Sequence, residues 1–145
     1  MIRKIVLSIL ISFLFVAPDT ASAAPDIAGR WKVYTTLVSA YQAVNPQYHP
    51  GDKRLEKWTV KAKGKKATLR SQAGTIQGKR VGKAWVFDQS YDTGYGVIVH
   101  IHLVARVYPG RKLRGTTEVR YYDSRAWLGN PILGNDAWTF KGTRL

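Results

Sequence analysis

The sequence of 145 residues contains no cysteine. Disulfide bonds, thiolate metal sites and cysteine nucleophiles are therefore excluded, and so is lipid attachment at a processed N-terminal cysteine. Without disulfides, a folded domain must be held together by its apolar packing, which a chain of this length can supply.

Acidic residues are scarce: the chain has 9 aspartates and glutamates against 23 lysines and arginines, a formal net charge of +14. The acidic residues are scattered singly along the sequence. No serine–histidine signature and no glycine-rich loop between a strand and a helix is present. We therefore expect a binding protein without a cofactor, rather than an enzyme. The excess of positive charge predicts attraction to anionic partners.

The first residues have the features of a secretory signal peptide. Two basic residues precede an apolar run over 5–17, and small residues follow over 20–24. Cleavage is expected after Ala23. An uncleaved membrane anchor is the alternative, although the run is shorter than the ~20 apolar residues that a spanning helix needs. The sequence thus predicts a signal peptide over 1–23 and a single periplasmic or secreted domain over 24–145.

Alternation of apolar and polar side chains with a period of two runs through the rest of the chain, and helical periodicity is almost absent. The clearest case lies over 97–108, where every second residue from Val97 to Val107 is apolar. Turn residues such as Gly64, Gly82 and Gly110 separate the alternating runs. The expected strands cover residues 28–38, 54–63, 66–73, 75–81, 84–90, 96–108, 113–122 and 136–144.

Eight short strands joined mostly by tight turns predict an all-β fold, an eight-stranded antiparallel up-and-down β-barrel. Closure of such a sheet removes its exposed edges, and the interior holds side chains or one small ligand. A sandwich is one alternative. A transmembrane barrel is another, but a Lys or Arg on its lipid-facing wall costs about 2–4 kcal/mol at mid-membrane. The strand faces opposite the aromatic ones carry Arg30, Lys32, Lys57, Lys61, Arg114 and Arg120.

The expected long loops, over 39–53 and 123–135, fall at the same end of an up-and-down barrel and are rich in tyrosine and tryptophan. Such rings can cover a ligand while their polar tips stay hydrated. We predict that this end binds a small hydrophobic or amphipathic molecule; alternatively, the rings fill the mouth as a small core. The expected interior residues are Trp58, Trp85, Ile101, Leu103 and Tyr121, and the expected mouth residues are Tyr41, Tyr95 and Trp127.

The short loops collect basic residues at the opposite end. Without residues 1–23 the domain keeps 21 basic and 8 acidic residues, a net charge of +13. The alternative function is therefore an envelope protein that binds anionic lipid, lipopolysaccharide or an acidic protein through this end; otherwise these side chains only keep the barrel soluble. Nucleic acid is not expected as a partner of an exported chain. The basic residues concerned are Lys63, Lys65, Lys66, Lys83, Arg111 and Lys112.

His100 and His102 form the one metal-like pattern in the sequence. Imidazoles at positions i and i+2 of a strand can share an ion, with His49 as a third ligand. Because both histidines lie opposite the apolar face of their strand, we expect them to face solvent and to bind no metal.

Short motifs at the two ends of the domain resemble those of the calycins, the superfamily that includes the lipocalins and the avidins. The first strand opens with Gly29 and Trp31, and the last strand ends with Arg144. The resemblance implies that Trp31 closes the bottom of the barrel and that Arg144 or Lys141 packs over it. The sixth turn lacks the Thr-Asp-Tyr type of sequence found in core lipocalins, and no polar set like that of the avidins is found. The resemblance implies an architecture without naming a ligand.

Overall fold

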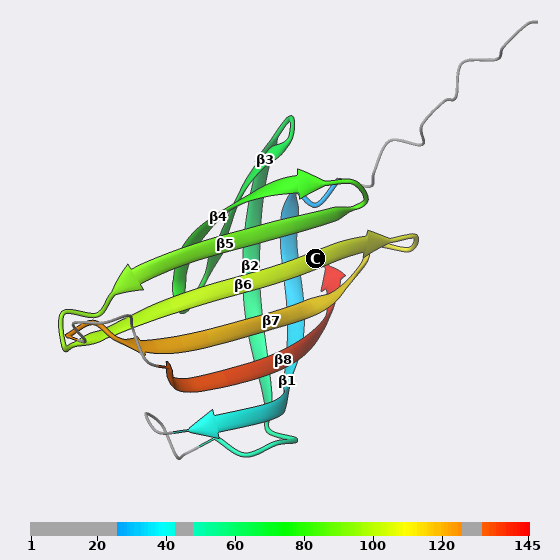
Figure 1. The fold of residues 1–145 in the computed structure, drawn as a ribbon. Helices are drawn as coiled ribbons and strands as arrows, with labels where there is room; N and C mark the ends of the chain where they lie inside the picture. Colours follow the sequence, from blue (N-terminus) through cyan, green and yellow to red (C-terminus); the bar gives the residue numbers. More distant parts are fainter. Residues whose placement is uncertain (1–25, 43–47, 126–131) are drawn as a thin grey trace, which may run out of the picture.

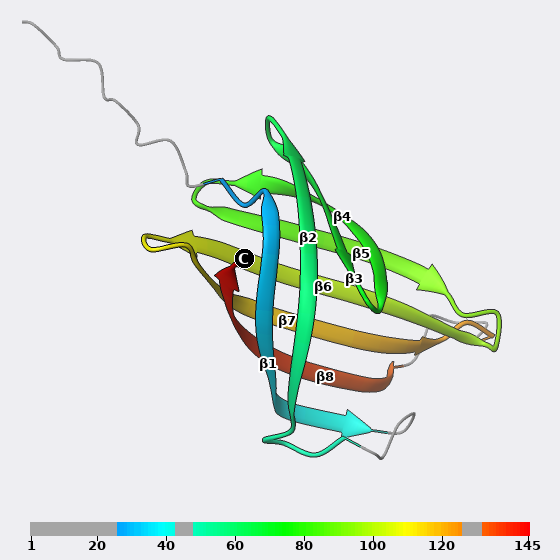
Figure 2. The same cartoon turned by 180° about the vertical axis from the view of Figure 1, so that it is seen from behind.

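A computed structural model describes residues 26–42, 48–125 and 132–145 (Figure 1). Each strand pairs antiparallel with its neighbours in sequence, and the last pairs with the first, so that the sheet closes into a barrel (Figure 2). The predicted all-β, eight-stranded antiparallel up-and-down barrel is thereby confirmed. The strands are β1 (Gly29–Gln42), β2 (Lys53–Lys63), β3 (Lys66–Ser71), β4 (Gly74–Val81), β5 (Ala84–Asp92), β6 (Val97–Tyr108), β7 (Lys112–Asp123) and β8 (Ile132–Arg144).

The expected signal peptide over 1–23 and the expected mouth residue Trp127 lie outside the described residues. In the part of the chain that the structure covers, no helix is long and apolar enough to cross a membrane.

The strands β1 and β8 are longer than the sequence pattern predicted. Their ladder continues past a bulge between Leu37 and Ser39, as far as Gln42 opposite Gly134. A bulge inserts one extra residue, and the alternation of inward and outward side chains reverses beyond it. The connections over 43–52 and 124–131 are consequently shorter than the loops expected over 39–53 and 123–135.

One half of the barrel is filled by a hydrophobic core. This half lies at the end that carries the β2–β3, β4–β5 and β6–β7 connections, which we call the closed end. Inward-facing glycines make room for large rings there: a Cβ on Gly78 would lie 2.4 Å from Phe87, and one on Gly115 would lie 2.4 Å from Phe140. The core residues are Ile27, Trp31, Val33, Trp58, Val60, Ala67, Leu69, Trp85, Phe87, Leu103, Ala105, Leu113 and Phe140.

Trp31 seals the closed end. Its side chain is fully buried, and its indole Nε1 donates a hydrogen bond of 2.9 Å to the carbonyl oxygen of Ile27. The guanidinium of Arg144, which pairs with Trp31 across the β1–β8 ladder, lies 4.8 Å from the centroid of the indole ring and donates to the carbonyl oxygen of Asp26. Gly29 has a φ of 135°, and a Cβ there would lie 3.4 Å from Arg144 Nε. Trp31 at the closed end with Arg144 over its ring is the arrangement that the resemblance implies.

Candidate functional site

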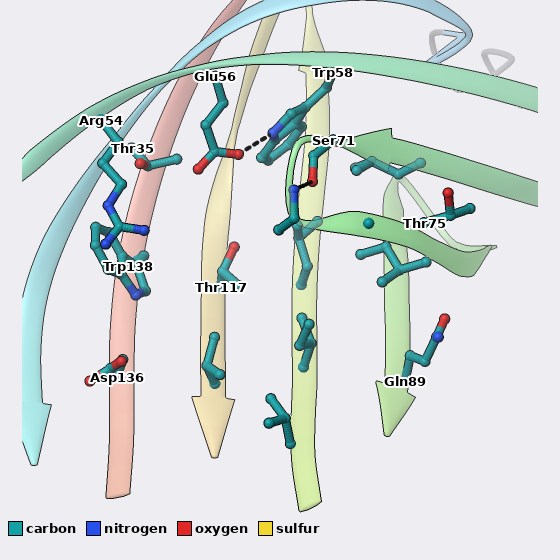
Figure 3. A pocket seen from close by; sticks show the side chains of 18 of the residues that line it. Thr35, Arg54, Glu56, Trp58, Ser71, Thr75, Gln89, Thr117, Asp136 and Trp138 are labelled. Atoms are coloured by element: carbon teal, nitrogen blue, oxygen red, sulfur yellow. Dashed lines mark hydrogen bonds between the residues drawn. The ribbon is translucent and has the colours of Figure 1, made fainter. Parts of the chain in front are cut away.

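The other half of the barrel encloses a cavity of about 500 Å³ (Figure 3). It extends to the end that carries the β1–β2, β3–β4, β5–β6 and β7–β8 connections, which we call the mouth, since Ala73 of the β3–β4 connection and Gly74, the first residue of β4, line it. Tyr48 and Tyr91 line the cavity at the same end.

The lining of the cavity has two chemically different sides. Strands β3, β4 and β6 contribute a mainly apolar side, with Ser71 and Thr75 near the mouth; its apolar residues are Leu69, Ile76, Val99, Ile101 and Leu103. Strands β1, β2 and β8 contribute a polar side, which consists of Thr35, Arg54, Glu56 and Asp136, together with the rings of Trp58 and Trp138.

Arg54 lies at the edge of the polar side, and its guanidinium packs against the ring of Trp138 (Figure 3) and against that of Tyr48. The guanidinium carbon lies 4.1 Å from the ring centroid of Tyr48 and 4.9 Å from that of Trp138. The two rings also meet edge to face, with their centroids 6.2 Å apart. These contacts join the β1–β2 connection, β2 and β8 near the mouth, and each cation–π contact stabilises the arrangement by about 0.5–2 kcal/mol depending on solvent exposure.

Glu56 lies deeper in the cavity, and one of its carboxylate oxygens accepts a hydrogen bond of 2.6 Å from Trp58 Nε1 (Figure 3). The two residues are two positions apart on β2 and therefore share the inward face. Thr35 on β1 is 6% exposed, and its hydroxyl oxygen has no hydrogen-bond partner among the described residues.

Asp136 is the most buried ionisable group of the cavity lining, with 3% of its surface exposed. The hydroxyl of Tyr121 donates a hydrogen bond of 3.2 Å to its Oδ2, whereas its Oδ1 has no partner within the described part of the chain. Burial raises the pKa of Asp136 above its usual value, against the opposing effects of the Tyr121 hydroxyl and the positive charge of Arg54. The pKa of Tyr121 is raised as well, mainly by burial and then by the negative charge of Asp136, so the phenol remains a hydrogen-bond donor.

Four of the five predicted interior residues line this cavity: Trp58, Ile101, Leu103 and Tyr121. The fifth, Trp85, is inside the barrel as predicted, but it does not line the cavity, so the expectation that it contacts a ligand there is wrong. Trp85 lies opposite Ala105, close to the β4–β5 turn, where the core fills the closed end, and it is 3% exposed.

Two predicted mouth residues point away from the cavity, so both expectations were wrong. Tyr41 lies beyond the β1 bulge, opposite Asn135, and is 67% exposed on the outer wall, whereas its neighbour Ala40 faces inward opposite Asp136. Tyr95 is 89% exposed because it stands at the tip of a tight turn. Hydrogen bonds of Thr93 to the backbone of Tyr95 and Val97 hold that turn closed.

The sequence analysis missed the charged side of the cavity, although the pattern that locates it is local. Arg54 and Glu56 have the same parity along β2 as Trp58, and Asp136 has the same parity along β8 as Trp138. Extending the alternation of the inward tryptophans by one or two steps toward the mouth would therefore have placed all three charged groups inside the barrel.

His100 and His102 lie on the outer wall of β6, where both bond to Asp88 of β5. His100 Nε2 is 2.5 Å from one carboxylate oxygen of Asp88, and His102 Nδ1 is 3.0 Å from the other. These hydrogen bonds, first that of His100 and then that of His102, lower the pKa of Asp88. Across residues 26–42, 48–125 and 132–145, no three histidine or acidic side chains are grouped so that they could hold a metal ion. His49 lies apart from this cluster, in the β1–β2 connection.

The basic residues predicted at the short connections all lie exposed around the closed end. None of them takes part in an ion pair with another described residue. Two exposed apolar side chains lie at the same connections: Val81 is 52% exposed and Tyr108 is 42% exposed. We call the following set the basic rim: Lys63, Lys65, Lys66, Lys83, Arg111 and Lys112.

No protein-family model, curated protein or solved structure matches this chain. The class that the fold and the site define is a closed eight-stranded antiparallel β-barrel, packed at one end and hollow at the other.

Proposed function

We propose that this protein binds a small amphipathic molecule inside its barrel, as an exported, calycin-like binding protein of the periplasm or the extracellular space. The observation that carries the proposal is the cavity of about 500 Å³ with its apolar and polar sides. Sites for small molecules have volumes of about 300–1,000 Å³ and combine an apolar lining with a few polar groups.

Two buried polar atoms in the cavity lining support this proposal. Thr35 Oγ1 and Asp136 Oδ1 have no hydrogen-bond partner among the described residues. A buried polar atom without a partner destabilises the fold by about 1–3 kcal/mol. A ligand with its own polar atoms would form hydrogen bonds with these two atoms. A role in ligand binding would explain why the barrel contains them despite their cost in stability. The signal-peptide pattern of residues 1–23 and the arrangement of Trp31 and Arg144 support export and the calycin-like architecture.

The cavity is tested by filling it. Ile101→Trp adds an indole on the apolar side and is expected to weaken binding of the neutral fluorescent probe N-phenyl-1-naphthylamine by at least about 10-fold, which is ~1.4 kcal/mol. Fluorescence titration measures the affinity and the stoichiometry, expected to be one probe per chain. Thr116→Trp is the matched control, because Thr116 is exposed on the outer wall of β7 and its replacement leaves the cavity unchanged.

Native mass spectrometry of the protein purified from its host gives a second test, with a bound small molecule as the expected result. If the probe does not bind in a one-to-one ratio, or if Ile101→Trp and Thr116→Trp bind it equally well, the cavity is not a binding site and the proposal fails.

A second candidate function is supported by the basic rim. Exposed cations that form no ion pair with another described residue, with Val81 and Tyr108 between them, suit a surface of anionic lipid or lipopolysaccharide, or an acidic protein. In cosedimentation with phosphatidylglycerol vesicles, binding should weaken steeply with salt and upon neutralisation of Lys65, Lys66, Lys83 and Arg111. The control neutralises an equal number of exposed cations on the barrel wall: Lys32, Lys53, Lys57 and Arg70. Binding that is insensitive to salt would eliminate this candidate.

A further inference from the structure

The charge inside the cavity has the opposite sign to the charge of the outer surface. Its lining contains two carboxylates, Glu56 and Asp136, and one guanidinium, Arg54. The domain as a whole is strongly basic. An anionic molecule is therefore attracted to the outside of this protein, whereas the formal charge inside the barrel favours a cation.

The positive charge of Arg54 is already engaged at the edge of the cavity. Its guanidinium lies against the rings of Tyr48 and Trp138, and no hydrogen bond joins it to Asp136 among the contacts of the described residues. Arg54 thus favours the ionised form of Asp136 from a distance but leaves Asp136 Oδ1 without a donor.

The groups around Asp136 supply one donor where the carboxylate needs more. Tyr121 on β7 donates to Oδ2, and on the β1 side the residue opposite Asp136 is Ala40, whose side chain has no donor. A buried carboxylate is stable in its ionised form only when an opposite charge and hydrogen bonds compensate it. The free oxygen of Asp136 is therefore a site for a charged hydrogen-bond donor.

We infer that the ligand of this barrel is a cationic amphiphile whose protonated amine donates to Asp136 Oδ1, while its apolar part packs on Leu69, Ile76 and Ile101. This inference rests on the proposed function and narrows its ligand class. Burial, which raises the pKa of Asp136, is consistent with it, because a cation bound next to that group would favour its ionised form.

Three ligands with the same chain and different head groups test the inference: decylamine, decanol and decanoate, each at a concentration at which it is monomeric in solution and at physiological salt. Isothermal titration calorimetry is expected to show the tightest binding for decylamine. Asp136→Asn should weaken decylamine binding by about 10-fold or more, because it removes one partner of a buried charged pair, and should change decanol binding by less than about 3-fold.

Glu118→Gln is the matched control. It removes one negative charge from β7, but Glu118 bonds to Arg120 on the outer wall, away from the cavity. This variant should bind decylamine as the unmodified protein does. If Asp136→Asn does not fold, the carboxyl ¹³C chemical shift of Asp136 in the unmodified protein replaces it as the readout. Decylamine should move this shift, and decanol should leave it nearly unchanged.

The outcomes separate this inference from the proposed function. Suppose that Ile101→Trp weakens the binding of all three ligands, but the protein binds decylamine no more tightly than the others and Asp136→Asn does not change its affinity. The cavity is then a binding site, and the amine inference is overturned. Tightest binding of decanoate within the cavity would also overturn it. If none of the ligands nor the neutral probe binds in a manner sensitive to Ile101→Trp, the proposed function itself fails.

Discussion

Replacing Trp31 with alanine is expected to lower the free energy of unfolding by about 3–5 kcal/mol, the range for deletion of a large buried ring. The side chain is fully buried at the closed end, its Nε1 bonds to Ile27, and Arg144 covers its face. Alanine would leave a cavity that the rigid wall of a closed barrel cannot collapse to fill. Urea unfolding followed by circular dichroism measures the loss.

Two further variants separate the contribution of the cation over Trp31 from that of the ring, and compare the stability of the two ends of the barrel. Arg144→Gln keeps the ring but removes the cation over it, and should cost only about 0.5–2 kcal/mol. Trp138→Ala removes a tryptophan of β8 that borders the cavity at the other end, so fewer packing contacts are lost. Equal losses for Trp31→Ala and Trp138→Ala, or a loss below about 1 kcal/mol for Trp31→Ala, would contradict the division into a packed and a hollow half.

Gly115→Ala is expected to destabilise the barrel by about 3 kcal/mol or more, at the upper end of what overpacking usually costs. A Cβ on Gly115 would lie 1.9 Å from the backbone oxygen of Val104 and 2.4 Å from the ring of Phe140. The ring could rotate, but the oxygen belongs to the neighbouring strand β6 and moves only if the wall of the barrel moves. Thermal and urea unfolding of the purified protein measure the effect.

The control for Gly115→Ala is Thr116→Ala, at the next position of β7. Thr116 is exposed on the outer wall, so its truncation should change the free energy of unfolding by no more than about 0.5 kcal/mol. Adding Phe140→Leu to Gly115→Ala should restore part of the lost stability, because the smaller side chain relieves one of the two clashes. A stability of Gly115→Ala equal to that of the unmodified protein would show that the wall yields at this point.

The sequence predicts those features of the candidate site that depend on neighbouring residues of one strand, and not those that depend on contacts between strands. The inward position of Trp58, Ile101 and Leu103 follows from alternation within their own strands, and the prediction located them in the cavity. Arg54 and Asp136 follow the same alternation. They were not predicted to line the cavity because charged side chains usually face solvent. Of the two, only Asp136 is buried, whereas Arg54 is exposed at the edge of the cavity and packs on the ring of Trp138, which comes from a distant part of the chain.

Tyr41 illustrates a limit of another kind. Its parity matches that of Leu37, and an unbroken strand would have pointed it inward. The bulge between Leu37 and Ser39 reverses the alternation, and its presence is decided by the fit of β1 to β8 across the ladder. No residue near Tyr41 in the sequence indicates the bulge, so the outward position of Tyr41 could not be derived from the sequence.

By itself, the sequence determined that this chain forms eight antiparallel strands in up-and-down order, because alternation and turn residues act over a few neighbouring positions. Only the tertiary structure decided that one half of the barrel is packed and the other hollow, and that Arg54, Glu56 and Asp136 meet in the same cavity. These properties depend on the register between strands and on the volumes of side chains from distant segments. Neither quantity is present in any single stretch of the chain.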